Sequence, residues 1–376
     1  MNTTITDFIS QHPTGTLLAV VIGVYCSLVQ RYRYSYLNEL RKKYPDPNTV
    51  LNDHDAAIEI YSHIFRREFP ELARTSLEFA LFKTFVIPSV SKLLVSTGEF
   101  ANSCTRRAED TELILSEIID AYPRIQNHLA EGNKVTEKDI VQQNHRAKLS
   151  VERLNQIHGK YPIRNGDYLY TLALFLSEPV RWINSYEWRK LDIREINAIF
   201  RVWHDIGVDM KIQDVPNTKE ELLKFKEEYE VKEIKYSPSN WKCAVPTIEH
   251  LLTRLPRFVG PLVYKFVPCF LEKRDIDAFG IDHPSWFIRL LFWFFIRSRA
   301  FFIRYFCFPR KRYLLRTPFH ANEDGKYMPH FFIYKPVVYP DGYCIPELGP
   351  EKMLPKSCPI AHRHTASQNN NNNKTE

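Results

Sequence analysis

Apolar residues recur at helical spacing along most of this chain, and strand-like alternation is nearly absent before residue 312. The clearest stretch is 135–158, a long helical pattern that ends close to a second one. One face of it, continued to residue 161, carries Ala147, Val151, Leu154, His158 and Tyr161. His158 therefore lies in line with apolar side chains. Residues 168–183 are apolar almost all round, which predicts a buried core helix.

The rest of the chain repeats the helical pattern in shorter segments. Pro88 separates two of these segments, because proline and its preceding residue rarely continue a helix. After residue 312, the run HFFIYKPVVY predicts a short extended tail packed on the domain. The pattern predicts an all-α fold with one main helical domain. Its further predicted helices are 53–69, 77–85, 89–95, 111–122, 193–209, 220–230, 244–255 and 262–270.

An N-terminal segment, TLLAVVIGVYCSLV at residues 16–29, carries no charge. It is short beside the roughly 20 apolar residues of a typical span, which suits a thin bilayer such as that of the ER. No Lys or Arg precedes Arg31, so a cleaved signal peptide is disfavoured. We expect residues 1–31 to be an uncleaved, single-pass anchor. Five Lys and Arg residues follow it, which places the main domain in the cytosol.

Residues 286–308, WFIRLLFWFFIRSRAFFIRYFCF, form a second strongly apolar segment. Four arginines interrupt it, so it is a poor transmembrane helix. Two interpretations remain open. It is either a core helix whose Arg side chains reach water, or an interfacial helix whose aromatic face enters lipid. Both would allow it to line a route for an apolar substrate.

Composition narrows the class of protein. The 376 residues are 44% hydrophobic and 14% aromatic, enough for a sizeable core. The formal charge of +7 fits membrane proximity better than nucleic acid, because no basic recognition helix is visible. Seven cysteines without a CxxC pair indicate reduced cytosolic thiols. Motifs for di-iron bundles, nucleotide binding and serine hydrolysis are missing from the sequence.

Several ordered motifs carry a resemblance to a known family. They are RLNQIHGKY, Asp167 followed by YTLALF, EPVRWINSYEWR, and EFALFKTFVIPSVSKLLVSTGEF at residues 78–100. The chain resembles fungal ER-bound oxygenases of the mpaB type and, more distantly, the rubber oxygenases called latex clearing proteins. The resemblance covers about residues 45–340, which we take as the catalytic domain with a globin-like haem-binding core. Residues 341–376 would form a C-terminal tail, disordered from about 362, where Gln and Asn dominate.

The resemblance implies haem b as cofactor, with His158 as its axial iron ligand. Spacing alone favours a core histidine bonded to a carbonyl. The rival ligands are His145, which we expect to be exposed, and His204, which has no evident partner.

Three further residues gain candidate roles from the resemblance. Lys83 and Thr84 match a Lys-Thr pair on the distal haem side, where a polar group would stabilise bound dioxygen. The alternative is a lysine that reaches water and a threonine that ends its helix. Arg153 would hold haem propionates, or else form a surface ion pair. Glu178 and Arg181, three residues apart, predict a structural ion pair.

The function expected from these features is that of a membrane-anchored, haem-dependent oxygenase at the ER. Its partners would be dioxygen and an apolar unsaturated substrate, a prenyl chain or lipid, with oxygenation or cleavage of a C=C bond. The alternative is a lipid-binding or scaffold protein of the ER surface that keeps the fold without catalysis.

Overall fold

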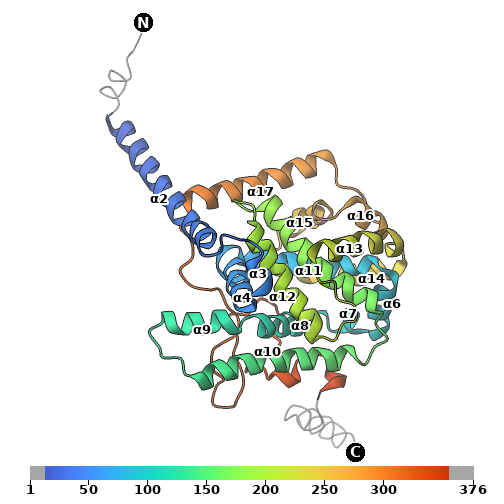
Figure 1. Cartoon of the computed structure of the whole chain (residues 1–376). Helices are drawn as coiled ribbons and strands as arrows, with labels where there is room; N and C mark the ends of the chain where they lie inside the picture. Colours follow the sequence, from blue (N-terminus) through green and yellow to red (C-terminus); the bar gives the residue numbers. More distant parts are fainter. Residues whose placement is uncertain (1–12, 355–376) are drawn as a thin grey trace, which may run out of the picture.

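The computed structural model describes residues 13–354, and every regular element in that range is a helix (Figure 1). The all-α prediction is confirmed. The disorder predicted from about residue 362 lies outside the described residues. The elements are α2 (Pro13–Lys43), α3 (Thr49–Asn52), α4 (His54–His63), η1 (Ile64–Glu68), α5 (Pro70–Lys83), η2 (Thr84–Val86), α6 (Pro88–Thr97), α7 (Glu99–Asn102), α8 (Cys104–Ile119), α9 (Ala121–Ala130), α10 (Glu137–His158), α11 (Asn165–Tyr186), α12 (Ile193–Asp209), α13 (Lys219–Glu233), α14 (Pro238–Leu252), α15 (Gly260–Phe266), η3 (Val267–Phe270), α16 (Lys273–Phe279), α17 (Trp286–Phe306), η4 (Ile345–Glu347) and η5 (Glu351–Met353).

Helix α11 is the centre of the body. It packs against α5, α12, α13 and α17, and its side chains are apolar on nearly every face. Leu174, Trp182 and Ile183 are fully buried. This is the buried core helix that the sequence predicted. Its length lets one element contact neighbours on all sides, so α11 sets the positions of the helices around it.

The chain turns sharply at Pro88. The helical residues 70–86 and 88–97 are bent by 99° relative to each other. Pro88 is the first residue of α6, where the missing N–H costs nothing, and it forces Ile87 before it into an extended conformation. The bend places η2 beside the start of α6, so Thr84 lies at an inner corner of the body.

The N-terminal helix α2 has two halves with different surroundings. Side chains of its first half, such as Leu17 and Val21, are more than half exposed, and the helix projects from the body (Figure 1). In its second half Val29, Leu37 and Leu40 are buried against the body. The helix is long and apolar enough to cross a membrane. The described part of the predicted anchor, residues 13–31, is thus the outer part of a longer helix whose second half packs on the body.

Helix α17 lies across the body where α2 leaves it (Figure 1). Only Phe292 and Ala300 of this helix are buried, whereas Trp286 is 76% and Phe294 63% exposed. The core-helix interpretation of this segment is therefore wrong. A surface helix that presents aromatic side chains outward fits the interfacial interpretation.

One buried arginine joins these two helices. Arg33 of α2 donates to the carbonyl oxygens of Ile303 at 3.0 Å and Cys307 at 2.7 Å, at the end of α17. Its guanidinium also lies 3.3 Å from the carboxylate of Glu68. A cation at the carboxyl end of a helix satisfies free carbonyls and the helix dipole. Arg33 therefore fixes α17 to the base of the projecting helix.

The segment after α17 follows the body surface without regular strands in its described part. The run at 330–339, predicted as extended, consists of bends, and it packs through the buried Tyr334 and Tyr339. The only strand-like pairing in residues 13–354 is a bridge between Tyr327 and Tyr343. Leu348, beyond residue 340, is also fully buried.

Replacing Arg33 by alanine tests the joint between α2 and α17. The substitution leaves Glu68 buried beside the free carbonyls of α17, so we expect a loss of about 3 to 5 kcal/mol in the free energy of unfolding. Arg41, whose side chain is 54% exposed beside Asp192, is the control. Arg41→Ala should cost no more than about 1 kcal/mol. Equal losses in denaturant titrations of the two variants would contradict the role of Arg33.

Candidate active site

A cavity of about 360 Å³ lies between α5, α6, α8, α10, α11, α12 and α14. Its volume is within the range of small-molecule sites. Most of its lining is apolar, and such a surface binds hydrocarbon and excludes water. Among its apolar lining side chains are Leu77, Leu81, Phe85, Leu154, Leu172 and Phe175.

His158, at the last position of α10, faces this cavity. Its ring lies 5.7 Å from that of Tyr168, and Nδ1 is buried without a hydrogen-bond partner in the described chain. Burial, with a smaller contribution from Arg107, lowers the pKa of His158 to about 4. The imidazole is therefore neutral at neutral pH. A neutral ring with an unpartnered nitrogen in an apolar cavity fits the requirements of an axial haem ligand.

Neither rival histidine from the sequence lines the cavity. His145 is exposed, as predicted. His204 does have a partner, contrary to expectation, since Nδ1 lies 3.2 Å from the carboxylate of Asp205.

A second histidine, His250 of α14, also lines the cavity and was not predicted from the sequence. Its Nδ1 lies 3.2 Å from Thr105 Oγ1, and its Nε2 is buried without a partner in residues 13–354. Burial, with a smaller contribution from Arg254, lowers its pKa to about 4. Its place in the apolar run TIEHLL was the available signal.

Arg107 of α8 is a third residue that sequence reasoning missed. It lines the same cavity and interacts with His158 electrostatically. Its guanidinium carbon lies 4.7 Å from the ring centre of Phe100. The available signal was its position seven residues before Ile114, which puts it in line with the apolar face if the predicted helix 111–122 is continued toward the N-terminus.

The structure separates the two residues of the Lys-Thr pair. Thr84 lines the cavity, and its hydroxyl donates to the carbonyl of Leu81 at 2.6 Å. Lys83 is not among the lining residues. It is fully buried, which makes the expectation of a lysine reaching water wrong. Its Nζ lies 3.0 Å from Glu178 and 3.3 Å from Asp275.

Lys83 belongs to a group of four cations and four carboxylates, buried at its centre and partly exposed at Arg181, Arg274 and Glu272, here called the Lys83 cluster. The predicted pair of Glu178 with Arg181 is confirmed and is part of it, at 2.5 Å. The cluster connects α5, α11, α13 and α16, so it stabilises their arrangement behind the cavity. Its members are Lys83, Arg181, Lys226, Arg274, Glu178, Glu230, Glu272 and Asp275.

Arg153 is not among the residues that line the cavity. Its guanidinium donates to the carbonyl of Leu348 at 2.8 Å and to that of Met353 at 3.0 Å. The side chain is buried, so the surface ion pair offered as an alternative is wrong. In this arrangement Arg153 attaches the C-terminal segment to α10, and the structure does not bring it to His158.

Comparison with known proteins gives a consistent set of relatives, although no protein-family model matches the chain. The chain is 31% identical over 316 residues to the ER-bound oxygenase mpaB' of Penicillium brevicompactum, covering 78% of this chain and 70% of that protein. It is 30% identical over 272 residues to the ER-bound oxygenase mpaB of Penicillium roqueforti (strain FM164), covering 66% and 85%.

Replacing Lys83 by alanine should destabilise the fold, because it leaves excess negative charge in the Lys83 cluster. We expect a loss of about 3 to 5 kcal/mol in the free energy of unfolding at neutral pH. Lys224, 77% exposed beside Glu228, is the control, and its replacement should cost under about 0.5 kcal/mol.

The loss in the free energy of unfolding caused by Lys83→Ala should also depend on pH. Burial opposes ionisation of Glu272, but Lys83 and neighbouring cations lower its pKa to about 2, below the ordinary glutamate value of 4.5. A depressed carboxyl pKa contributes stability above the unfolded value, and that stability is lost as pH falls. The difference in the free energy of unfolding between wild type and variant should therefore become smaller as pH falls below about 4.5. A penalty that is small, or constant down to pH 3, would contradict the cluster's electrostatic role.

Proposed function

This chain belongs to the family of ER-bound oxygenases of the mpaB type, and on that premise we propose a membrane-anchored, haem-dependent oxygenase. Its substrates would be dioxygen and an apolar unsaturated molecule, a prenyl chain or another lipid. The reaction would oxygenate or cleave a C=C bond. The globin-like arrangement around a haem belongs to the same proposal.

The observation that carries the proposal is His158, a neutral imidazole with an unpartnered buried nitrogen at an apolar cavity. His158 would hold the iron, and haem b, when bound, supplies the chemistry of dioxygen activation. Helix α10 gives the ligand a rigid base. Thr136 and Asp139 form a capping box at its start, and Arg153 attaches its far end to the C-terminal segment.

The cavity's own side chains would orient the substrate. Leu154, Leu172 and Phe175 offer an apolar surface to a hydrocarbon chain and exclude water from it. Of the Lys83–Thr84 pair, only Thr84 lines the cavity. The distal polarity proposed for that pair therefore rests on the Thr84 hydroxyl, with Lys83 acting behind the site.

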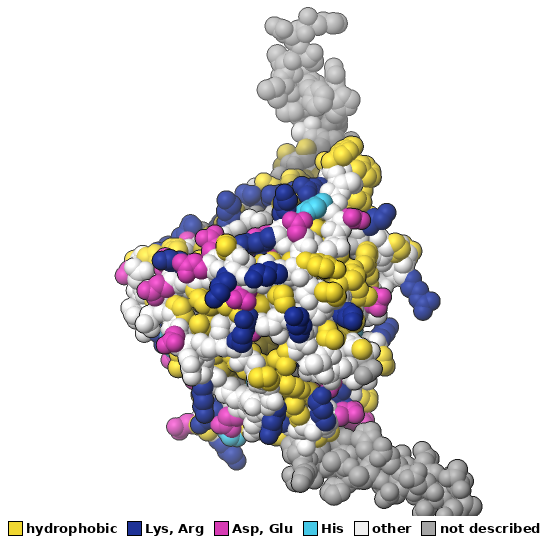
Figure 2. All heavy atoms as spheres, turned by 90° about the vertical axis from the view of Figure 1, so that its right-hand side faces the viewer, with side chains coloured by type: hydrophobic (Ala, Val, Ile, Leu, Met, Phe, Trp, Pro, Cys, Tyr) yellow, Lys and Arg dark blue, Asp and Glu magenta, His cyan; other side chains and the backbone are white. Residues whose placement is uncertain are grey.

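The two outer helices support attachment to a membrane. The exposed half of α2 would cross the bilayer, and α17 would lie at its surface with Trp286 and Phe294 in lipid. Figure 2 shows the side of the body that lies on the right in Figure 1, where hydrophobic, basic and acidic side chains are interspersed. The positive charge that follows the anchor supports the proposal that the body lies in the cytosol, at the ER membrane.

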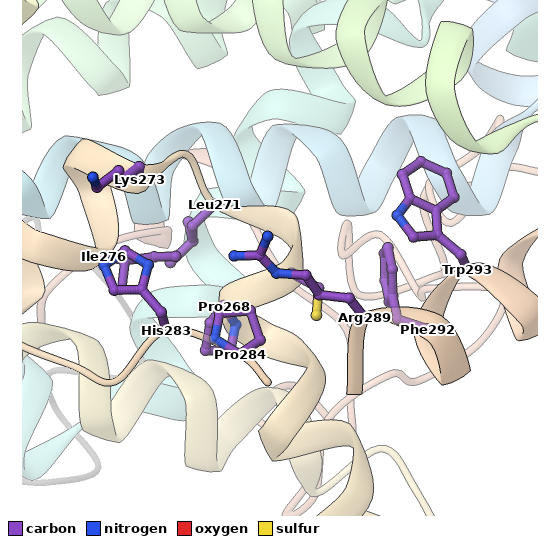
Figure 3. Close-up of a pocket in the computed structure, with 10 residues that line it drawn as sticks. Pro268, Leu271, Lys273, Ile276, His283, Pro284, Arg289, Phe292 and Trp293 are labelled. Carbon is purple, nitrogen blue, oxygen red and sulfur yellow. The ribbon is translucent and has the colours of Figure 1, made fainter. Parts of the chain in front are cut away.

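A second pocket, of about 660 Å³, lies at this membrane-facing helix (Figure 3). Arg289 and Trp293 of α17 line it together with Lys273 of α16 and His283 from the intervening loop. Its mixed basic and aromatic lining suits a lipid headgroup with the start of a chain. We propose that apolar substrate meets the protein here after leaving the bilayer.

Absorption spectroscopy of the purified protein tests the haem assignment. Protein expressed with ample haem should show a Soret band, and His158→Ala should lose it, with haem affinity reduced at least about 100-fold. His204→Ala, outside the cavity, is the matched control and should keep the band. A His158→Ala protein that binds haem normally would remove the ligand assignment. A colourless wild type would favour the lipid-binding or scaffold alternative.

Stepwise removal of the two apolar surfaces tests the membrane assignment. Deleting residues 1–24, which precede the contacts of α2 with α17, should release most of the protein from microsomes into the soluble fraction. Adding Phe294→Gln and Phe301→Gln should release the remainder. Protease added to sealed microsomes should digest the full-length body. Continued sedimentation of the combined variant, or protection from protease without detergent, would contradict the arrangement.

A further inference from the structure

Arg107 is the exception among the charged side chains that line the cavity. Every other one lies within 4 Å of an opposite charge, whereas Arg107 has no carboxylate at that distance in the described chain. The pairs are Arg66–Asp120, Arg74–Glu78, Arg254–Glu78, Lys352–Glu99, Arg106–Asp110, Arg316–Glu112 and Arg164–Asp167.

An unpaired cation in this position has a physical cost. Burial lowers the pKa of Arg107, which means that the surroundings penalise its charge. A guanidinium nevertheless stays protonated in proteins. The fold compensates every other charge at the cavity, so the missing partner of Arg107 is best supplied by a ligand.

The charge of the site selects the kind of anion. In the described chain Arg107 is the only charged lining side chain without an opposite charge within 4 Å, so it contributes one unpaired positive charge to the lining. A carboxylate carries one negative charge and matches the guanidinium fork with two hydrogen bonds. A phosphate monoester, with nearly two negative charges, would leave negative charge unpaired.

We propose that Arg107 binds the carboxylate of an amphipathic ligand whose apolar part fills the cavity. Two molecules carry this chemistry. One is a long-chain carboxylic acid in the place of the substrate, and the other is haem through a propionate. The inference deepens the proposed function and rests on it only for the second source. Arg107 would then set the position of the ligand's polar end relative to His158.

Comparing each carboxylic acid with its own methyl ester distinguishes the two possible ligands. The full-length protein in lipid nanodiscs is titrated with cis-parinaric acid and with its methyl ester, and energy transfer from cavity-lining Trp203 reports on the probe. A Soret titration compares haemin with haemin dimethyl ester. Each titration uses wild type, Arg107→Gln and the neighbouring control Arg106→Gln, whose guanidinium is already paired with Glu351 at 2.7 Å.

Loss of the charge partner of a carboxylate in this cavity should weaken binding by about 30-fold or more. Arg107→Gln should weaken the free acid by that factor and leave its ester unchanged, and ester binding shows that the variant is folded. Weakening of parinaric acid identifies a substrate carboxylate, and weakening of haemin identifies a propionate. Arg106→Gln should change neither. If Arg107→Gln weakens neither acid, or if wild type does not prefer either acid to its ester, the proposal is overturned.

The two proposals fail separately. A protein that binds parinaric acid through Arg107 but never shows a Soret band would refute haem dependence and keep the carboxylate site. A protein that shows a Soret band but binds both acids equally well with and without Arg107 would keep haem dependence and refute the carboxylate site.

Discussion

Buried cations paired with buried carboxylates from distant parts of the chain constrain the whole body. Arg146 lies 2.6 Å from Glu117, Arg316 lies 2.7 Å from Glu109, and the Lys83 cluster joins four helices. A desolvated charge without its partner costs several kcal/mol, so helices packed in another arrangement would be heavily penalised. Arg107 departs from this pattern of paired charges. Among the charged side chains that line the cavity, Arg107 alone has no opposite charge within 4 Å in the described chain, and we propose that a ligand supplies it.

Local pattern predicted the helices well because an amphipathic helix records its burial in its own sequence. The bounds of α12 were predicted correctly, and α11 was correctly identified as a core helix. The same reasoning placed His158 on an apolar face, and His158 does line the cavity. Resemblance to the mpaB family, carried by ordered motifs, supplied what spacing alone could not.

The surroundings of charged side chains were not predictable in this way, because the partners that bury them lie far away in sequence. Lys83 pairs with Glu178, 95 positions later, and Arg153 donates to Leu348, 195 positions later. Either residue could equally have reached water on pattern alone. Arg107 and His250 were missed for the same reason. A polar residue on an apolar helix face is informative only once the opposite wall of the cavity is known.

Our central proposal is that a ligand binds in the cavity beside His158 and Arg107. An experimentally determined map of the full-length protein, purified from its own membrane, tests this most directly. We expect ligand density in that cavity. The ligand should contact the His158 ring, and its anionic end should contact the Arg107 guanidinium. A cavity without density, or a ligand found only in the pocket beside α17, would contradict it.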